Sequence, residues 1–198
     1  MHPEARDFTL SVKSQFPTFF EGKRVLDVGA GDVNGNNRFL FEGCEYHGND
    51  VFPAPNVTIV SKTSDLQFGP ETFDTIISTE CFEHDPEYKQ SLQKIVTMLK
   101  PSGLFLFTCA STGREEHGTR RSHPVCSYGT IGEIEGWQDY YKNLTFEDIV
   151  QCIDMNVFSK FEHFYNPTSC DLYFWGIKSS RITPRYISKH INFRNFVQ

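Results

Sequence analysis

The sequence predicts an α/β fold in which helices cover a mostly parallel sheet, and three observations carry this prediction. Residues 25–28 form an apolar run that leads into a glycine turn at Gly29 and Gly31, as a buried parallel strand does. Similar apolar runs recur at residues 73–79 and 104–110. A segment with helical periodicity separates those two runs, and this alternation is typical of a doubly wound sheet.

The chain of 198 residues has the length of one domain, so we expect a single domain over residues 1–198. Its parts are an N-terminal helix within 1–22, a core over 23–110 and an insert over 111–143. A closing helix with two strands over 144–179 and a tail over 180–198 complete it.

The first element is a helix within residues 3–20. Pro3 and Glu4 suit a first helical turn, and Phe8, Val12 and later phenylalanines recur at helical spacing. Pro17 is expected to end the regular part. A helix that covers the core explains this pattern fully.

The second strand is expected over residues 44–50, after a short helix at about 36–42 that Gly43 ends. This strand closes on Asp50, 23 positions after Asp27. Nucleotide-binding βαβ units hold ribose hydroxyls with an acid about 20 residues past the glycine turn. A solvated acid at a strand end is the simpler interpretation. The link to a third strand at 57–60 is too short for a crossover helix.

The fourth strand covers residues 73–79 and the fifth covers 104–110. Between them, residues 86–99 favour a helix with Leu92, Ile95, Val96 and Leu99 on one face, and residues 100–103 favour a turn. Thr145 is typical of a helix N-cap, and residues 160–165 and 171–178 favour two closing strands.

Residues 111–143 form a long polar connection, and long connections are often functional. Its guanidinium groups could hold an anionic group of a substrate, and its aromatic rings could stack on a sugar or an aromatic ring. The rings could equally form a small core within the insert. The candidate substrate-binding residues are Arg114, Arg120, Arg121, Trp137, Tyr140 and Tyr141.

Two histidines are candidate catalytic residues. His84 follows the fourth strand, and His117 lies in the insert; an imidazole can take up a proton near neutral pH. A packing or capping histidine at 84 and a solvated loop histidine at 117 are the alternatives. Glu83, His84 and Asp85 could form part of a metal site, but no metal-ligand spacing stands out, and we expect no metal.

Charge and cysteine usage limit the partners and the compartment. A net charge of −6 argues against a broad nucleic-acid or anionic-membrane surface. No apolar run approaches the roughly 20 residues that span a bilayer, and the N-terminus lacks the pattern of a signal peptide. The six cysteines are scattered without a CxxC pair, which favours free thiols and a cytoplasmic protein.

Several blocks, taken together in order and spacing, resemble the class I S-adenosylmethionine-dependent methyltransferases, in particular their small methyltransferase-domain group. A dinucleotide site would favour G-x-G-x-x-G, but Asn34 stands where its third glycine belongs. The blocks are residues 25–31, Asp50, residues 64–66, residues 73–84 and residues 99–104.

The resemblance implies a Rossmann-like seven-stranded sheet of order 3-2-1-4-5-7-6 with an antiparallel last strand. It also implies S-adenosylmethionine as the cofactor. Asp50 would bind the ribose hydroxyls, Asp65 would face the adenine amino group, and Thr79 and Glu80 would line the methionine side. The implied cofactor-binding residues are Asp27, Gly29, Ala30, Gly31, Asp50, Val51, Ser64, Asp65, Leu66, Thr79 and Glu80.

The expected function is methyl transfer to a small-molecule or glycan acceptor, with O-methylation favoured, under the 111–143 insert. One alternative is a macromolecular acceptor that docks on the basic tail. Another is a non-catalytic cofactor-binding partner subunit, against which the acids Asp27, Asp50 and Asp65 speak. We expect no membrane and no nucleic-acid partner, and the oligomeric state stays open.

Overall fold

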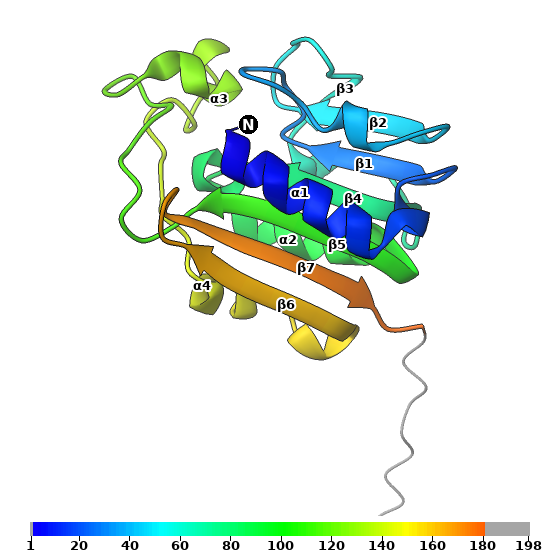
Figure 1. Cartoon of the computed structure of the whole chain (residues 1–198). Coiled ribbons are helices and arrows are strands. Elements are labelled where there is room, and N and C mark those ends of the chain that lie inside the picture. The colour runs from blue at the N-terminus through cyan, green and yellow to red at the C-terminus, as the bar shows by residue number, and fades with distance from the viewer. Residues whose placement is uncertain (1, 181–198) are drawn as a thin grey trace, which may run out of the picture.

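A computed structural model describes residues 2–180, and the predicted basic tail lies outside the described residues apart from its first position. The sheet has seven strands in the order β3-β2-β1-β4-β5-β7-β6 (Figure 1). Strand β7 runs antiparallel to both β5 and β6, whereas β1 to β5 pair in parallel. The predicted fold class and strand order are therefore confirmed.

The described strands are β1 Arg24–Val28, β2 Glu45–Asp50, β3 Ile59–Val60, β4 Phe73–Thr79, β5 Leu99–Ala110, β6 Phe158–Asn166 and β7 Asp171–Lys178. The α-helices are α1 Pro3–Gln15, α2 Tyr88–Met98, α3 Tyr128–Ile131 and α4 Phe146–Val150. The 3₁₀ turns are η1 Pro17–Phe19, η2 Arg38–Leu40, η3 Thr63–Asp65, η4 Phe82–His84, η5 Pro124–Cys126 and η6 Met155–Val157.

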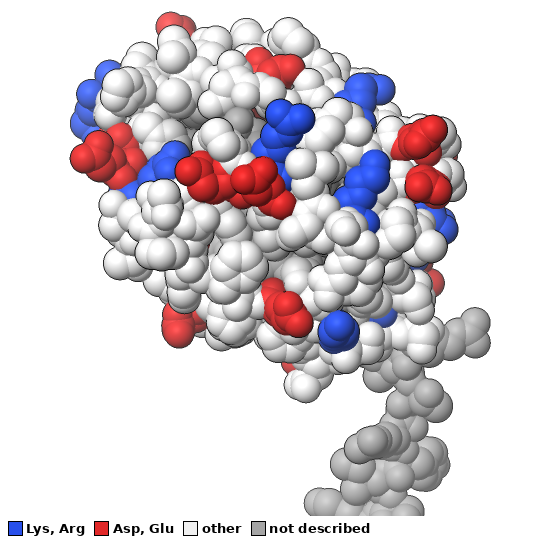
Figure 2. Space-filling view, viewed as in Figure 1, with Lys and Arg blue, Asp and Glu red and all other residues white. Residues whose placement is uncertain are grey.

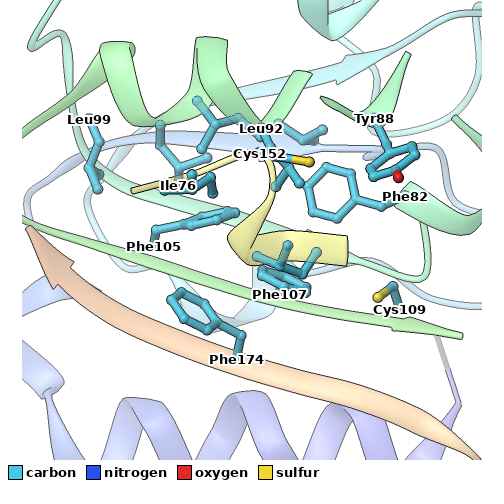
Figure 3. Packing of buried hydrophobic residues seen from close by; sticks show 14 of the residues in the cluster. Ile76, Phe82, Tyr88, Leu92, Leu99, Phe105, Phe107, Cys109, Cys152 and Phe174 are labelled. Atoms are coloured by element: carbon cyan, nitrogen blue, oxygen red, sulfur yellow. The ribbon is translucent and has the colours of Figure 1, made fainter. Parts of the chain in front are cut away.

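Strand β5 is apolar along its length because both of its faces are buried. Successive side chains of a strand point to opposite faces. Phe105 and Phe107 therefore pack with α2 and Phe174, as Figure 3 shows, whereas Leu104 and Leu106 pack on the other face. Helix α1 crosses that second face in Figure 1. Apolar contacts on both sides explain why the strand reads as a continuous run.

The carboxyl ends of the central parallel strands lie at one edge of the sheet. Val28, the last residue of β1, pairs with Asn49 of β2 and with Ser78 of β4. This register brings the residues that follow these three strands to the same place. Polar groups separated by tens of residues in the sequence can therefore form one site.

Some predicted boundaries were wrong. Residues 100–103 belong to β5 as a bulge rather than a separate turn, because the register moves from Phe73↔Leu99 to Thr75↔Leu104. Leu99 therefore starts a strand instead of ending the helical face. The helix expected at 36–42 is only the turn η2, and the strand expected at 160–165 extends over the whole of β6.

The link between β2 and β3 contains no helix, as predicted. All six cysteines are free thiols, which confirms the expectation from their spacing. Within residues 2–180, no helix has the length and apolar character needed to cross a membrane. On the face in Figure 2, acidic and basic side chains are interspersed rather than gathered by sign.

Candidate active site

A cleft of about 970 Å³, part of it open to solvent, lies where β1, β2 and β4 end. The glycine turn, Asp50 and the start of the insert line it. Its place at the carboxyl ends of the strands is where α/β sheets bind ligands.

The glycine turn is packed too closely for side chains. Gly29 has a φ of +71°, and a Cβ there would lie 2.5 Å from the Sγ of Cys81. A Cβ on Gly31 would lie 2.3 Å from the ring of Tyr128. The amides of Gly29 and Ala30 both donate to the carbonyl of Asn49 at 2.9 Å, which fixes the turn beside β2.

Asp50 is held at the side of the cleft by two backbone amides. Its Oδ2 accepts from the amide of Gly31 at 3.0 Å, and its Oδ1 accepts from the amide of Val51 at 2.7 Å. Burial raises the pKa of Asp50 to about 6, although the two amide bonds act in the opposite direction. Each carboxylate oxygen keeps a second acceptor position, so this group can still accept hydrogen bonds from a ligand.

Asp27 anchors a buried network under the cleft. The hydroxyl of Tyr46 donates to its Oδ2, and the amide of Asn37 donates to its Oδ1 at 3.0 Å. The same Asn37 amide lies 3.1 Å from the hydroxyl of Thr79. Burial raises the pKa of Asp27 to about 7. The network joins β1, β2 and β4 and fixes the floor of the cleft.

Glu80 connects the end of β4 to the first helix. The hydroxyl of Thr108 donates to its Oε1 at 2.7 Å, and its Oε2 lies 3.3 Å from Nε2 of His2. The same His2 nitrogen lies 2.8 Å from Asp171. Burial alone would lower the pKa of His2, but the bonds to Asp171 and Glu80 outweigh it and raise the pKa to about 10. The start of α1 is therefore tied to the strand ends.

Three of the predicted cofactor-binding residues, Ser64, Asp65 and Leu66, do not line the cleft. Leu66 is buried in the hydrophobic core. The hydroxyl of Ser64 donates to Glu87 at 2.6 Å, and Asp65 is exposed on η3. Their roles toward a cofactor stay predictions. The other predicted cofactor residues, from Asp27 to Glu80, all line the cleft.

The two candidate catalytic histidines meet, although they lie 33 positions apart in the chain. Their ring centroids are 4.9 Å apart, and the ring of Tyr141 lies 5.6 Å from His84 and 5.1 Å from His117. Both histidines line the cleft. Burial lowers the pKa of His84 to about 3, so its imidazole is neutral at physiological pH.

Only some of the predicted substrate residues face the cleft. Arg114 and Trp137 line it, whereas Tyr140 does not. Arg120 donates to Asp139, and Arg121 lies 2.9 Å from Glu116. Both of these arginines are exposed. Their guanidinium groups hold the insert together at its surface.

The sequence did not single out three further residues of the site: Tyr128, Asn37 and His2. Tyr128 lies over Gly31, donates its hydroxyl to the carbonyl of Asp32 at 3.1 Å and stacks near Phe52 at 6.4 Å between ring centroids. No sequence signal identifies it, because its contacts reach 96 positions back along the chain. The asparagine-rich segment before η2 was the only local sign of Asn37.

Three kinds of similarity accompany this geometry. The profile of a family described as a methyltransferase domain matches residues 3–160. A curated relative, phosphoethanolamine N-methyltransferase 2 of Caenorhabditis elegans, is 27% identical over 136 residues. That match covers 60% of this chain and 31% of the relative, so this chain spans less than a third of the relative's length.

Two solved structures share the fold. Haemonchus contortus phosphoethanolamine N-methyltransferase 2, in complex with phosphomonomethylethanolamine and S-adenosylhomocysteine, matches with a TM-score of 0.57 at 18% identity, over 87% of this chain and 52% of that one. Burkholderia thailandensis 1,6-didemethyltoxoflavin-N1-methyltransferase matches with a TM-score of 0.54 at 16% identity, over 88% and 90%. At these identities the likeness shows the fold.

Proposed function

We propose a specific reaction for this chain, which belongs to the S-adenosylmethionine-dependent methyltransferase domain family. In this proposal it transfers a methyl group to a hydroxyl of a small molecule or glycan. The observation that carries the proposal is the joining of the glycine turn and Asp50 in one cleft with His84 and His117. When bound, S-adenosylmethionine supplies the methyl group from a sulfonium. The chain's own residues position the reactants and receive a proton.

The residues present fit this cofactor. The turn at Gly29 and Gly31 lines the cleft with backbone, and the carboxylate of Asp50 stands beside it with free acceptor positions. A carboxylate there suits the two hydroxyls of a ribose. Thr79 and Glu80 would lie at the methionine end, next to the histidines.

We place the acceptor under the insert, between the histidines and Arg114. A hydroxyl acceptor loses a proton on methylation, so a group that takes up or displaces this proton is needed. His84 and His117 line the cleft and are the candidates, and His84 is the weaker base because burial lowers its pKa to about 3. Arg114 would attract an acceptor with a negative charge, although its Nη1 already donates to the carbonyl of Ser169 at 2.7 Å.

Methylation of an amine nitrogen is the second candidate. The observation that favours it is the 27% identity to phosphoethanolamine N-methyltransferase 2. The two are distinguished by incubation with S-adenosylmethionine that carries a labelled methyl group. The panel of acceptors contains small amines, small alcohols and phenols, glycans, proteins and nucleic acids. Label only in amines would overturn the hydroxyl proposal, and label only in proteins or nucleic acids would overturn both.

Asp50→Asn is expected to weaken binding of S-adenosylhomocysteine by about 10- to 100-fold. A hydrogen bond to a charged group contributes about 1.5–3 kcal/mol, and the amide cannot accept from both hydroxyls in the same way. Titration calorimetry measures the change. Glu45→Gln is the matched control, because Glu45 lies on the same strand at its exposed opposite end. Equal affinity of both variants would contradict the ribose assignment.

The affinity for S-adenosylhomocysteine is also expected to rise with pH through about 6. Below that value Asp50 is protonated, since burial has raised its pKa, and a protonated carboxyl accepts less well. Stability changes in the opposite direction: the folded state holds this proton more tightly, so the Asp50 contribution falls as pH rises from about 4 to 6. Titration calorimetry with S-adenosylhomocysteine between pH 5 and 8 tests the predicted change in affinity. In Asp50→Asn the affinity should no longer depend on pH in this range.

A further inference from the structure

Glu83, His84 and His117 form a compact cluster at the acceptor side of the cleft. We propose that this cluster binds one divalent transition-metal ion of the zinc type. The inference rests on the proposed function for the role of the ion. With the ion bound, the two imidazoles would act as its ligands, and the ion, rather than a free imidazole, would lower the pKa of an acceptor hydroxyl. The binding itself depends only on the described side chains.

The donor atoms already lie close together. One donor atom of each residue lies within 4.8 Å of the donor atoms of the other two. A tetrahedral ion with ligands at about 2.0–2.2 Å would hold them roughly 3.5 Å apart. Small side-chain rotations, including one of the half-buried His117, would close this difference. His84 and Glu83 are adjacent on the turn η4 and are both buried.

Among the described residues, the buried carboxylate of Glu83 lacks a counterion. Its carboxylate is fully buried, and across residues 2–180 neither of its side-chain oxygens has a hydrogen-bond partner of good geometry, although the backbone amides of Glu83 and Ala110 lie nearby. Protonation would not remove the problem, because the O–H would also lack an acceptor. The nearest histidine nitrogen, Nε2 of His84, is 3.9 Å from Oε1, which is too far for a hydrogen bond. A cation between the two would satisfy both groups.

His84 also has an unpaired nitrogen. Its Nδ1 is buried and has no hydrogen-bond partner among the described residues, and either Nδ1 or Nε2 of this ring, but not both, could bind the ion. The insert packs directly on this ring, because a Cβ on Gly118 would lie 2.6 Å from its Cε1. Gly118 follows His117, so the same glycine seats the third ligand beside the other two.

A second cluster of similar composition also contains buried atoms without a hydrogen-bond partner, but its groups form close ion pairs with one another. His2, Glu80 and Asp171 also lie within reach of one ion. There, however, His2 lies 2.8 Å from Asp171, and the hydroxyl of Thr108 donates to Glu80. Internal ion pairs satisfy those charges. Arg114 lies 3.8 Å from the same Asp171. We therefore assign the ion to Glu83, His84 and His117 alone.

The donor set selects the class of metal. Two imidazoles and one carboxylate suit Zn²⁺ and related transition-metal ions, whereas Mg²⁺ and Ca²⁺ prefer oxygen ligands. Three protein ligands leave at least one coordination position open. His84 and His117 line the cleft, so this position would face an acceptor and could bind its oxygen or nitrogen.

The test is metal binding by the full chain without cofactor or acceptor. Chelator-treated protein is titrated with Co²⁺, whose absorption reports the ligands, and with Zn²⁺ in competition with a metal indicator. We expect one ion per chain, with a Co²⁺ spectrum of nitrogen and oxygen ligands. Glu83→Gln and His117→Gln should weaken binding by at least about 10- to 100-fold, the loss that even outer-shell changes cause.

His163→Gln is the matched control, because His163 is exposed on β6 and should leave metal binding unchanged. His117→Gln keeps the test valid if the buried Glu83→Gln fails to fold. Absence of binding by the wild-type chain, wild-type affinity in His117→Gln, or a thiolate charge-transfer band would each overturn the proposal. Because cofactor binding is measured separately, its failure and that of the metal site are distinguishable.

Discussion

Phe107→Ala is expected to lower the free energy of unfolding by about 3–5 kcal/mol, the range for truncating a buried phenylalanine. Phe107 is fully buried on β5. Its ring centroid lies 5.2 Å from that of Phe174 and 5.4 Å from those of Phe82 and Phe105, and Figure 3 shows these rings between the sheet and α2. Truncation removes buried apolar surface and leaves a cavity that aromatic neighbours on three sides cannot readily fill.

Equilibrium unfolding in urea measures this loss, and Phe39→Ala is the matched control. Phe39 is 47% exposed. The guanidinium carbon of Arg6 lies 5.0 Å from the centroid of its ring. An exposed cation–π pair of this kind contributes about 0.5–1 kcal/mol, so the control should lose no more than that. Similar losses in the two variants would contradict the packing described for this core.

Gly29→Ala is expected to destabilise the chain by about 2–5 kcal/mol and to weaken cofactor binding with it. The left-handed backbone at φ +71° costs an alanine about 1–2 kcal/mol. The new Cβ would also meet Cys81 at 2.5 Å, and such overpacking costs about 1–3 kcal/mol more. Relief of the clash by a shift of the turn would move the amide of Gly31 away from Asp50.

Gly22→Ala separates the two contributions. Gly22 has a φ of +60°, but nothing lies within 4 Å of the position of its Cβ. Only the backbone cost should appear there. Urea unfolding gives the stabilities, and calorimetry with S-adenosylhomocysteine gives the affinities. If both variants lost the same free energy and bound equally well, the close packing of the glycine turn against Cys81 would be disproved.

Much of the fold could be predicted because its signals are local. The apolar runs of β1, β4 and β5 and the capping box that begins with Thr145 follow from neighbouring residues alone. The bulge in β5 could not be predicted in this way. Residues 100–103 contain Pro101 and Gly103, which are typical of turns, and only pairing with β4 draws them into the strand.

The sequence by itself determined the fold class, the strand order through its resemblance to a family, and a line of cleft residues from Asp27 to Glu80. These features depend on the spacing of residues along single elements. Because the carboxyl ends of parallel strands lie at one edge of the sheet, residues at those ends come together there. Only the tertiary structure decided which distant groups meet there. It brought Tyr128 over Gly31, His2 to Asp171, and His117 to Glu83 and His84. The long insert makes the first and third of these contacts, and the N-cap of α1 makes the second. All three depend on how distant segments pack over the sheet, which no local pattern encodes.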